Sequence, residues 1–214
     1  MPGDNIKLWY LPGSCALAPH ILLREIGKDF ELVEMTMEKL SGEYDAINPK
    51  RRVPALALNS NEIITENPAV MLAISNLAPE KHLMGKTQMD TVRAIEWGTW
   101  LSGTMHGQAF AGVWRPHRFI GEPEFYDKIK AQGMITIKES FKFIEDKLSG
   151  LHAVGDEFTG TDAYLFAIYR WGQTIKLPMA SDYPKLTALV LEVSKRESAI
   201  AALKAEGRPP FTVQ

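Results

Sequence analysis

The chain has 214 residues, of which 45% are hydrophobic and 23% are charged, and its formal net charge is −2 at pH 7. This composition is typical of a globular protein with one large domain or two small ones. The near-neutral charge gives no electrostatic reason to expect nucleic acid or an anionic membrane as a partner. No uninterrupted apolar run reaches the roughly 18 residues that a membrane-spanning helix needs.

The sequence contains one cysteine, Cys15, so it cannot form an internal disulfide bond. This is typical of a reducing compartment. The first residues lack the basic region and the apolar core of a secretory signal. We therefore expect a cytoplasmic protein.

The first region with a chemical signal surrounds Cys15. The apolar run at residues 6–10 predicts a strand, and residues 16–26 predict a helix. Cys15 would then lie at the start of the helix, where free backbone N–H groups and the helix dipole favour an anion. Such a position lowers the pKa of a thiol and makes it reactive. The alternative is that Cys15 is a small buried hydrophobic residue.

Further strands and a helix are expected in the first 80 residues. Residues 30–35 alternate apolar and acidic side chains, as a half-buried strand does. Residues 53–58 and 62–65 predict two antiparallel strands joined by a tight turn at residues 59–61. Asn67-Pro68 opens a helix that continues to about residue 78. This order of elements predicts a compact α/β domain.

Beyond this region no strand pattern is present, and we expect an all-helical second domain. Long helices are predicted at residues 87–113 and 125–148. Shorter ones are predicted at residues 186–193 and 200–203. After Arg208 we expect a loosely ordered tail.

The centre of the second domain is expected at an apolar helix that follows Thr159 and Asp162. These two residues have the spacing of a capping box, and a helix that is hydrophobic on all sides is buried. We predict a first domain at residues 1–82, a linker at 83–87 and a helical domain at 88–214.

Several local sequences, taken in order, resemble the cytosolic glutathione transferases, and in particular their cysteine-containing beta class. The matching stretches are Leu11–His20, Asn48-Pro49-Lys50, Val53–Leu56, Thr65-Glu66-Asn67, Glu96-Trp97, His106, Trp114-Arg115-Pro116 and Phe158–Phe166. The resemblance implies a thioredoxin-like N-terminal domain, an all-helical C-terminal domain and a homodimer.

The resemblance also implies a glutathione site in the first domain. Val53-Pro54 would present a free strand edge to the extended peptide, although Pro54 could be an ordinary strand-opening proline. Glu66 and Asn67, at a helix start, would bind the γ-glutamyl end. The family usually has serine at the position of Asn67, but asparagine caps a helix equally well.

The glycyl carboxylate of glutathione would end beside a basic triplet. Lys50 is the first candidate to bind it and Arg52 the second. The family usually has a small residue beside the lysine, so the paired arginines, Arg51 and Arg52, leave the choice of side chain open.

His106 would reach the bound thiol and Cys15, where an imidazole can stabilise a thiolate or carry its proton. Gly107 stands where the family commonly has lysine. The other four histidines, including His20, are expected to be structural. The second substrate would be a small apolar electrophile bound between the domains. Four aromatic residues could line its pocket or simply pack in the core: Trp9, Phe110, Trp114 and Phe119.

The function implied is a glutathione transferase that adds the glutathione thiol to this electrophile. Cys15 would also permit thiol–disulfide exchange through a mixed disulfide with glutathione. The alternatives are a glutathione-dependent isomerase, dehydratase or dehalogenase of a specialised pathway, and a non-catalytic ligand-binding protein. Glutathione is the only cosubstrate expected, and no metal site is expected.

Overall fold

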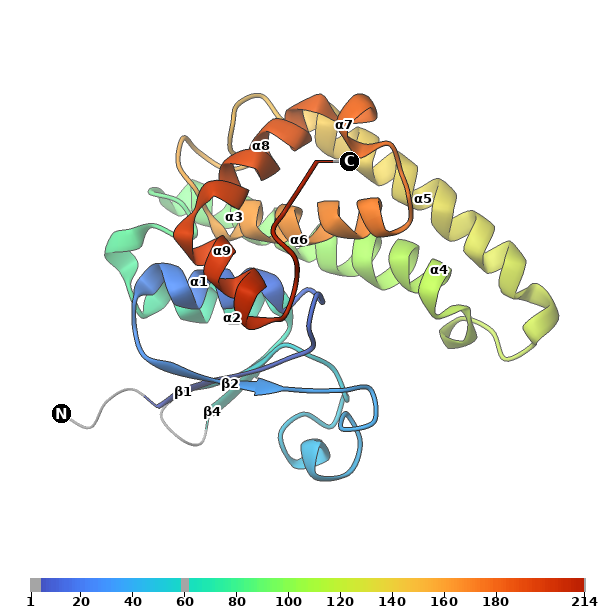
Figure 1. Cartoon of the computed structure of the whole chain (residues 1–214), viewed down its shortest axis with the longest axis horizontal. Coiled ribbons are helices and arrows are strands. Elements are labelled where there is room, and N and C mark those ends of the chain that lie inside the picture. The colour runs from blue at the N-terminus through green and yellow to red at the C-terminus, as the bar shows by residue number, and fades with distance from the viewer. Residues whose placement is uncertain (1–4, 59–61, 214) are drawn as a thin grey trace.

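The computed structural model describes residues 5–58 and 62–213, so the turn predicted at residues 59–61 lies outside the described part. A small β-sheet with two helices on one face lies against a larger layer of helices (Figure 1). The thioredoxin-like arrangement followed by a helical domain, expected from the resemblance, is therefore confirmed.

The sheet has four strands in the order β2-β1-β3-β4. β1 is parallel to β2, whereas β3 is antiparallel to both β1 and β4. The four strands span the following residues: β1 Ile6–Tyr10, β2 Phe30–Glu34, β3 Ala55–Leu58 and β4 Glu62–Thr65. Each predicted strand is present, and β3 begins two residues later than expected, just after a cis Val53-Pro54 bond.

Two helices, α1 (Leu17–Ile26) and α2 (Asn67–Asn76), cover one face of the sheet (Figure 1). Successive side chains of a strand point to opposite faces, so alternate residues of β1 are buried beneath these helices. Trp9 lies on the other face. There it packs with residues of a smaller apolar cluster that includes Tyr44 of the 3₁₀ turn η1 (Gly42–Ala46).

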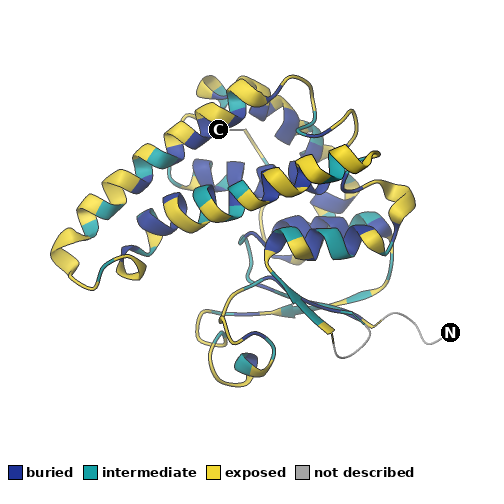
Figure 2. Ribbon diagram, turned by 180° about the vertical axis from the view of Figure 1, so that it is seen from behind, coloured by how far each residue is buried: buried dark blue, intermediate teal, exposed yellow. Residues whose placement is uncertain are grey.

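The described residues of the second half contain no strand, as predicted. The helices are α3 Gln88–Trp100, η3 Leu101–Phe110, α4 Ala111–Trp114, α5 Tyr126–Lys147, α6 Gly160–Thr174, α7 Met179–Asp182, α8 Pro184–Lys195 and α9 Glu197–Ala205. Short 3₁₀ turns lie at Pro79–Lys81 (η2), Pro116–Arg118 (η4) and Pro123–Phe125 (η5). The predicted capping box of Thr159 and Asp162 is present at the start of α6. Almost every residue of α6 is buried, which confirms it as the centre of the helical layer (Figure 2).

The long helix predicted at residues 87–113 is continuous, but its middle is not α-helical. Residues 101–110 form the π-helix η3. This geometry is rare in proteins, and where it occurs it is often at a functional site. In this π-helix the backbone of Ser102 lies close to Gly107, and a Cβ atom at position 107 would lie 2.9 Å from the Ser102 carbonyl oxygen. Glycine, which has no Cβ atom, avoids this close contact.

One apolar core joins the two halves of the chain. Helix α1 packs against α6 and α9. Leu83 and Met84, in the segment between the predicted domains, are 3% exposed and belong to this core. The segment is packed between the halves, and the domain limits stay a prediction.

The tail after Arg208 packs against α6, so the expectation of a loosely ordered tail is wrong. It runs back across α6 (Figure 1). The Gln173 amide donates a hydrogen bond to the Thr212 carbonyl over 2.9 Å, and the Phe211 ring packs 5.2 Å from that of Phe166. The apolar ring in a proline-rich segment supplies the anchor that the sequence reasoning overlooked.

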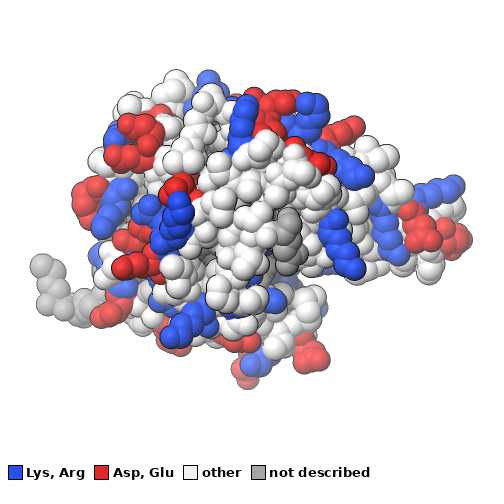
Figure 3. All heavy atoms as spheres, turned by 45° about the horizontal axis from the view of Figure 1, so that its top comes forward, with Lys and Arg blue, Asp and Glu red and all other residues white. Residues whose placement is uncertain are grey.

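The outer surface carries both signs of charge. On the face shown in Figure 3, basic and acidic side chains are interspersed. Among the described residues, no helix has the length and apolar character needed to cross a membrane.

Candidate functional site

Two adjoining cavities lie where the loop after β1 meets the helical layer. Cavity A has a volume of about 310 Å³ and contains Cys15, and cavity B has a volume of about 490 Å³ and contains Trp171. The residues that line both cavities are Leu11, Ser14, His106 and Arg115. A ligand that passes this shared boundary would therefore contact both spaces.

Cys15 lies at the wall of cavity A, two residues before α1 begins. The residue is 4% exposed, and its Sγ atom is 3.6 Å from the carbonyl oxygen of Val53. Burial raises the pKa of the Cys15 thiol to about 12. The backbone N–H groups and the nearby Arg115 have the opposite effect, but it is smaller. The expectation of a lowered pKa is therefore wrong: at neutral pH the thiol keeps its proton and can donate it to a hydrogen bond.

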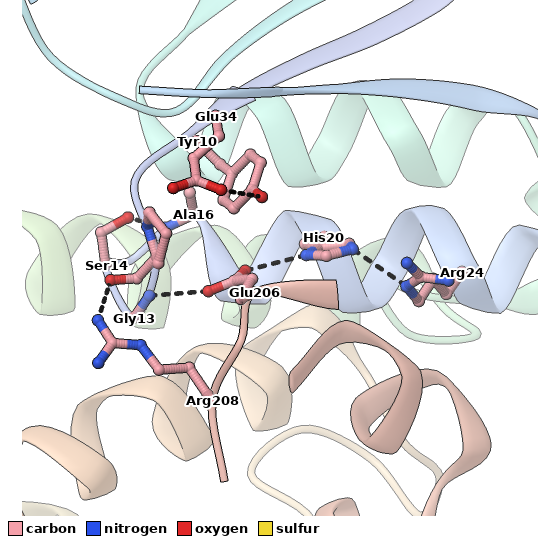
Figure 4. A network of polar contacts seen from close by, with 10 residues as sticks. Tyr10, Gly13, Ser14, Ala16, His20, Arg24, Glu34, Glu206 and Arg208 are labelled. Carbon is pink, nitrogen blue, oxygen red and sulfur yellow. Dashed lines mark hydrogen bonds and ion pairs between the residues drawn. The ribbon is translucent and has the colours of Figure 1, made fainter. Parts of the chain in front are cut away.

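The loop before Cys15 is held by residues from the far end of the chain (Figure 4). The Gly13 N–H donates to a Glu206 carboxylate oxygen over 2.7 Å, and the Trp171 indole N–H donates to the Gly13 carbonyl over 2.9 Å. The other oxygen of Glu206 lies 2.9 Å from Nδ1 of His20, and the Arg24 side chain donates to Nε2 of His20. His20 is completely buried in this network, which agrees with a structural role.

His106 lies on the π-helix η3, at the boundary between the cavities. Its ring packs edge-on against Trp171, with 4.8 Å between the centroids. Burial, together with the positive charges of Arg115, Arg52 and Arg118, lowers the pKa of His106 to about 4. The imidazole is thus neutral at physiological pH and can accept a proton.

Val53, Pro54, Glu66 and Asn67, the predicted peptide-binding residues, all line cavity A. Asn67 is 4% exposed, and its amide interacts with the Tyr164 hydroxyl but has no hydrogen bond of regular geometry to a described residue. Such a buried amide is costly unless a ligand or water satisfies it. Glu66 precedes α2 with a φ of 72°, a left-handed conformation uncommon for a side chain of this kind.

The basic triplet divides into residues with different partners. Lys50 donates to Thr65 and to the Glu66 carboxylate, and it does not line cavity A. Arg51 and Arg52 both line cavity A. Arg51 forms a bidentate pair with Asp45, whereas Arg52 has no ion pair among the described residues. The geometry thus favours Arg52 over Lys50, the reverse of the order given by the sequence.

The four aromatic residues predicted for the second-substrate pocket are separated in the structure. Trp114 lines cavity B and Phe119 lines cavity A. Phe110 is completely buried behind Trp114 and Trp171, with centroid distances of 4.9 and 5.3 Å. Trp9 faces the opposite side of the sheet, because strand alternation turns it away from both cavities.

The sequence reasoning missed several lining residues, which all come from the helical half or its tail. They are Arg115, Arg118, Tyr164, Arg170, Trp171 and Arg208. Arg115 and Tyr164 were present in matching stretches, but neither side chain was interpreted. The other residues gave no local signal, because only the packing of the helical half and the tail brings them to the cavities.

The sequence and the structure were compared with known proteins. Residues 4–74 match the family "Glutathione S-transferase, N-terminal domain", and residues 115–197 match "Glutathione S-transferase, C-terminal domain". The glutathione S-transferase GstA of Escherichia coli O157:H7 is 32% identical over 208 residues, which cover 94% of this chain and 99% of GstA.

Solved structures agree with this result. The beta-class glutathione S-transferase of Sphingomonas chungbukensis is 34% identical, with a TM-score of 0.82 over 94% of this chain and 98% of the other. A glutathione transferase homologue from Sulfitobacter, solved with bound glutathione, is 29% identical, with a TM-score of 0.88 over 96% of this chain and 99% of the other. The fold, the two family matches and the GstA relative agree, and the chain belongs to the glutathione S-transferase family.

Proposed function

We propose that the chain binds glutathione in cavity A and adds its thiol to an electrophile held in cavity B. The observation that carries the proposal is the buried amide of Asn67, which lines cavity A at the start of α2 and has no hydrogen bond of regular geometry among the described residues. Its neighbour in the cavity wall is the Tyr164 hydroxyl, which leaves hydrogen-bonding capacity of the amide for a ligand. The N-terminus of a helix is a site that favours a carboxylate.

The chemistry of the lining fits the two ends of the tripeptide. Asn67 and the N–H groups at the start of α2 would bind the γ-glutamyl carboxylate, and the adjacent Glu66 would accept from the amino group. Arg52 would bind the glycyl carboxylate. The Sulfitobacter homologue was solved with glutathione, which supports the same ligand here.

The thiol of glutathione would then lie near the boundary between the cavities, beside Cys15 and His106. The neutral His106 would accept a hydrogen bond from the thiol S–H, and the thiol proton would pass to water, while the Arg115 charge and the Cys15 S–H would stabilise the thiolate. The sulfur lone pair would attack the electrophilic carbon. A carbon–sulfur bond would form, and the leaving group would depart with its bonding electrons.

Thiol–disulfide exchange through Cys15 is the less favoured chemistry. The attacking species in exchange is a thiolate, whereas Cys15 is 4% exposed and the pKa of its thiol is raised. A homodimer and a cytoplasmic location are inferred from the family resemblance.

Calorimetric titration with glutathione tests the proposal. Asn67→Ala should raise the dissociation constant about tenfold, since this corresponds to about 1.4 kcal/mol, the size of one charge-assisted contact. Asn76→Ala is the matched control, because Asn76 is exposed at the other end of α2 and should leave binding unchanged. No binding of glutathione by the unaltered protein at 10 mM would contradict the proposal, as would equal effects of the two variants.

Turnover is tested with 1-chloro-2,4-dinitrobenzene. His106→Ala should lower kcat/KM about tenfold with glutathione still bound, since the loss of one hydrogen bond to the reacting sulfur corresponds to about 1.4 kcal/mol. An unchanged rate would remove His106 from the reaction.

A further inference from the structure

Cavity B has a strongly cationic lining. Arg115, Arg170 and Arg208 contribute to it, and no aspartate or glutamate does. Among residues 5–58 and 62–213, none of the three arginines has a carboxylate within ion-pair distance. The interspersed charges of the outer surface in Figure 3 contrast with this single-sign lining.

The charges of these arginines are not compensated locally. Burial and the neighbouring Arg208 lower the pKa of Arg170, with a smaller opposing effect from Glu206. Burial and two other arginines lower the pKa of Arg115, whose Nε atom is buried without a hydrogen-bond partner. Each guanidinium therefore lies in an environment that an added anion would improve.

The carboxylate of Glu206, which acts on the pKa of Arg170, is engaged elsewhere. Its two oxygens accept from the Gly13 N–H and contact the His20 ring, and its side chain is 0% exposed (Figure 4). Arg208 donates one hydrogen bond to the Pro12 carbonyl, which fixes its guanidinium against the loop before Cys15. Its other N–H groups remain available to a ligand.

Aromatic rings form another part of the wall of cavity B. The rings of Trp114 and Trp171 meet edge to face, with 5.5 Å between their centroids. Trp171 is fixed by its hydrogen bond to the Gly13 carbonyl, and the Phe211 ring of the tail completes the lining. Such a surface favours a flat aromatic group.

We propose that cavity B selects an aromatic second substrate that carries a carboxylate or a comparable anionic group, bound by Arg170 and Arg208. This refines the proposed function, on which it depends, and replaces the expected apolar electrophile with an anionic one. Arg115, at the boundary, serves both cavities. The two arginines that bind the anion line cavity B but not cavity A, so they do not compete for the carboxylates of glutathione.

Two unreactive probes of the same shape separate charge from ring stacking. 3-Nitrobenzoate and 3-nitrobenzamide differ in the negative charge, and neither has a leaving group to react with glutathione. Their dissociation constants are to be measured by calorimetry in the presence of 10 mM glutathione, so that cavity A is occupied. The benzoate should bind at least about tenfold more tightly, and the preference should fall with added salt, since screening weakens ion pairs.

Three variants assign the preference to cavity B. Arg170→Gln should weaken the benzoate about tenfold and the benzamide less than twofold, whereas Arg170→Lys should keep most of the preference because it keeps the charge. Lys204→Gln removes one positive charge from an exposed site of α9 and should change neither constant.

The proposal is overturned if the two probes bind equally, if neither binds, or if Arg170→Gln and Arg170→Gln/Arg208→Gln both keep the preference. It is also overturned if the benzoate is displaced by glutathione, because the anion would then have occupied cavity A. The glutathione titration with Asn67→Ala is independent of these outcomes. Failure of the anion site and failure of the transferase site can therefore be told apart.

Discussion

The backbone N–H of Gly13 donates a hydrogen bond to the carboxylate of Glu206, a residue 193 positions later in the chain. This contact fixes the loop that carries Ser14 and Cys15 against the end of the last helix (Figure 4). The position of the Cys15 sulfur thus depends on a residue outside both cavities.

Glu206→Ala should destabilise the protein. The substitution leaves the Gly13 N–H and the His20 ring without their buried partner, and breaking such a pair costs about 3 kcal/mol. Urea unfolding measures the change. Glu192→Ala removes an exposed carboxylate that pairs with Lys195, and this control should cost less than about 1 kcal/mol. Equal effects of the two substitutions would show that the buried contact of Glu206 contributes no more to stability than the exposed ion pair of Glu192.

The raised pKa of Cys15, about 12, predicts how fast the thiol is alkylated. Because only the thiolate reacts, the rate with iodoacetamide should rise about tenfold per pH unit from pH 7 to pH 10, without a plateau. Arg115→Gln removes an attraction for the thiolate and should slow alkylation further at each pH. A plateau below pH 9 would contradict the account of the buried thiol.

The lowered pKa of His106, about 4, predicts a dependence of stability on pH. Between about pH 6.5 and pH 4 the unfolded chain binds a proton at this histidine and the native protein does not. The free energy of unfolding should therefore decrease as the pH is lowered through this window, by up to about 1.4 kcal/mol per pH unit. His106→Asn should remove that part of the slope, and identical slopes for the two proteins would contradict the prediction.

The same electrostatics predicts the effect of the neighbouring arginines. Arg118→Gln removes one of the positive charges that disfavour the imidazolium, so the pKa of His106 should rise. Titration of the His106 ring signals by NMR measures the change. A fall in the pKa would contradict the arrangement of charges described here.

Two residues of the basic triplet, Lys50 and Arg52, should differ in their contribution to glutathione binding. Arg52→Gln should raise the dissociation constant of glutathione about tenfold, because it removes a charge-assisted contact. Lys50→Gln should change it less than about threefold, because Lys50 is paired with Glu66 and lies outside cavity A. Calorimetric titration of both variants decides between them, and a larger effect of Lys50→Gln would restore the order expected from the sequence.

The fold could be predicted from the sequence where signals were local. Alternation and turn residues located the four strands, and the spacing of Thr159 and Asp162 located the start of α6. Part of the lining of cavity A was found for the same reason, because these residues lie in the short motifs Val53-Pro54 and Glu66-Asn67.

Other features depend on contacts between distant segments. Arg170 and Arg208 of cavity B come from α6 and from the tail, and nothing near them in the sequence indicates that they meet the loop before Cys15. The raised pKa of Cys15 results from burial by the assembled fold, which opposes the local effect of the helix start. Trp9 was misplaced because the sequence does not show which face of β1 meets the helices.

A crystal structure with S-(4-nitrobenzyl)glutathione, an unreactive conjugate, tests the central claim most directly. The account predicts the peptide in cavity A, with its γ-glutamyl end on Asn67, and the aryl group in cavity B beside Trp171. A peptide outside cavity A, or an aryl group that points away from His106, would contradict it.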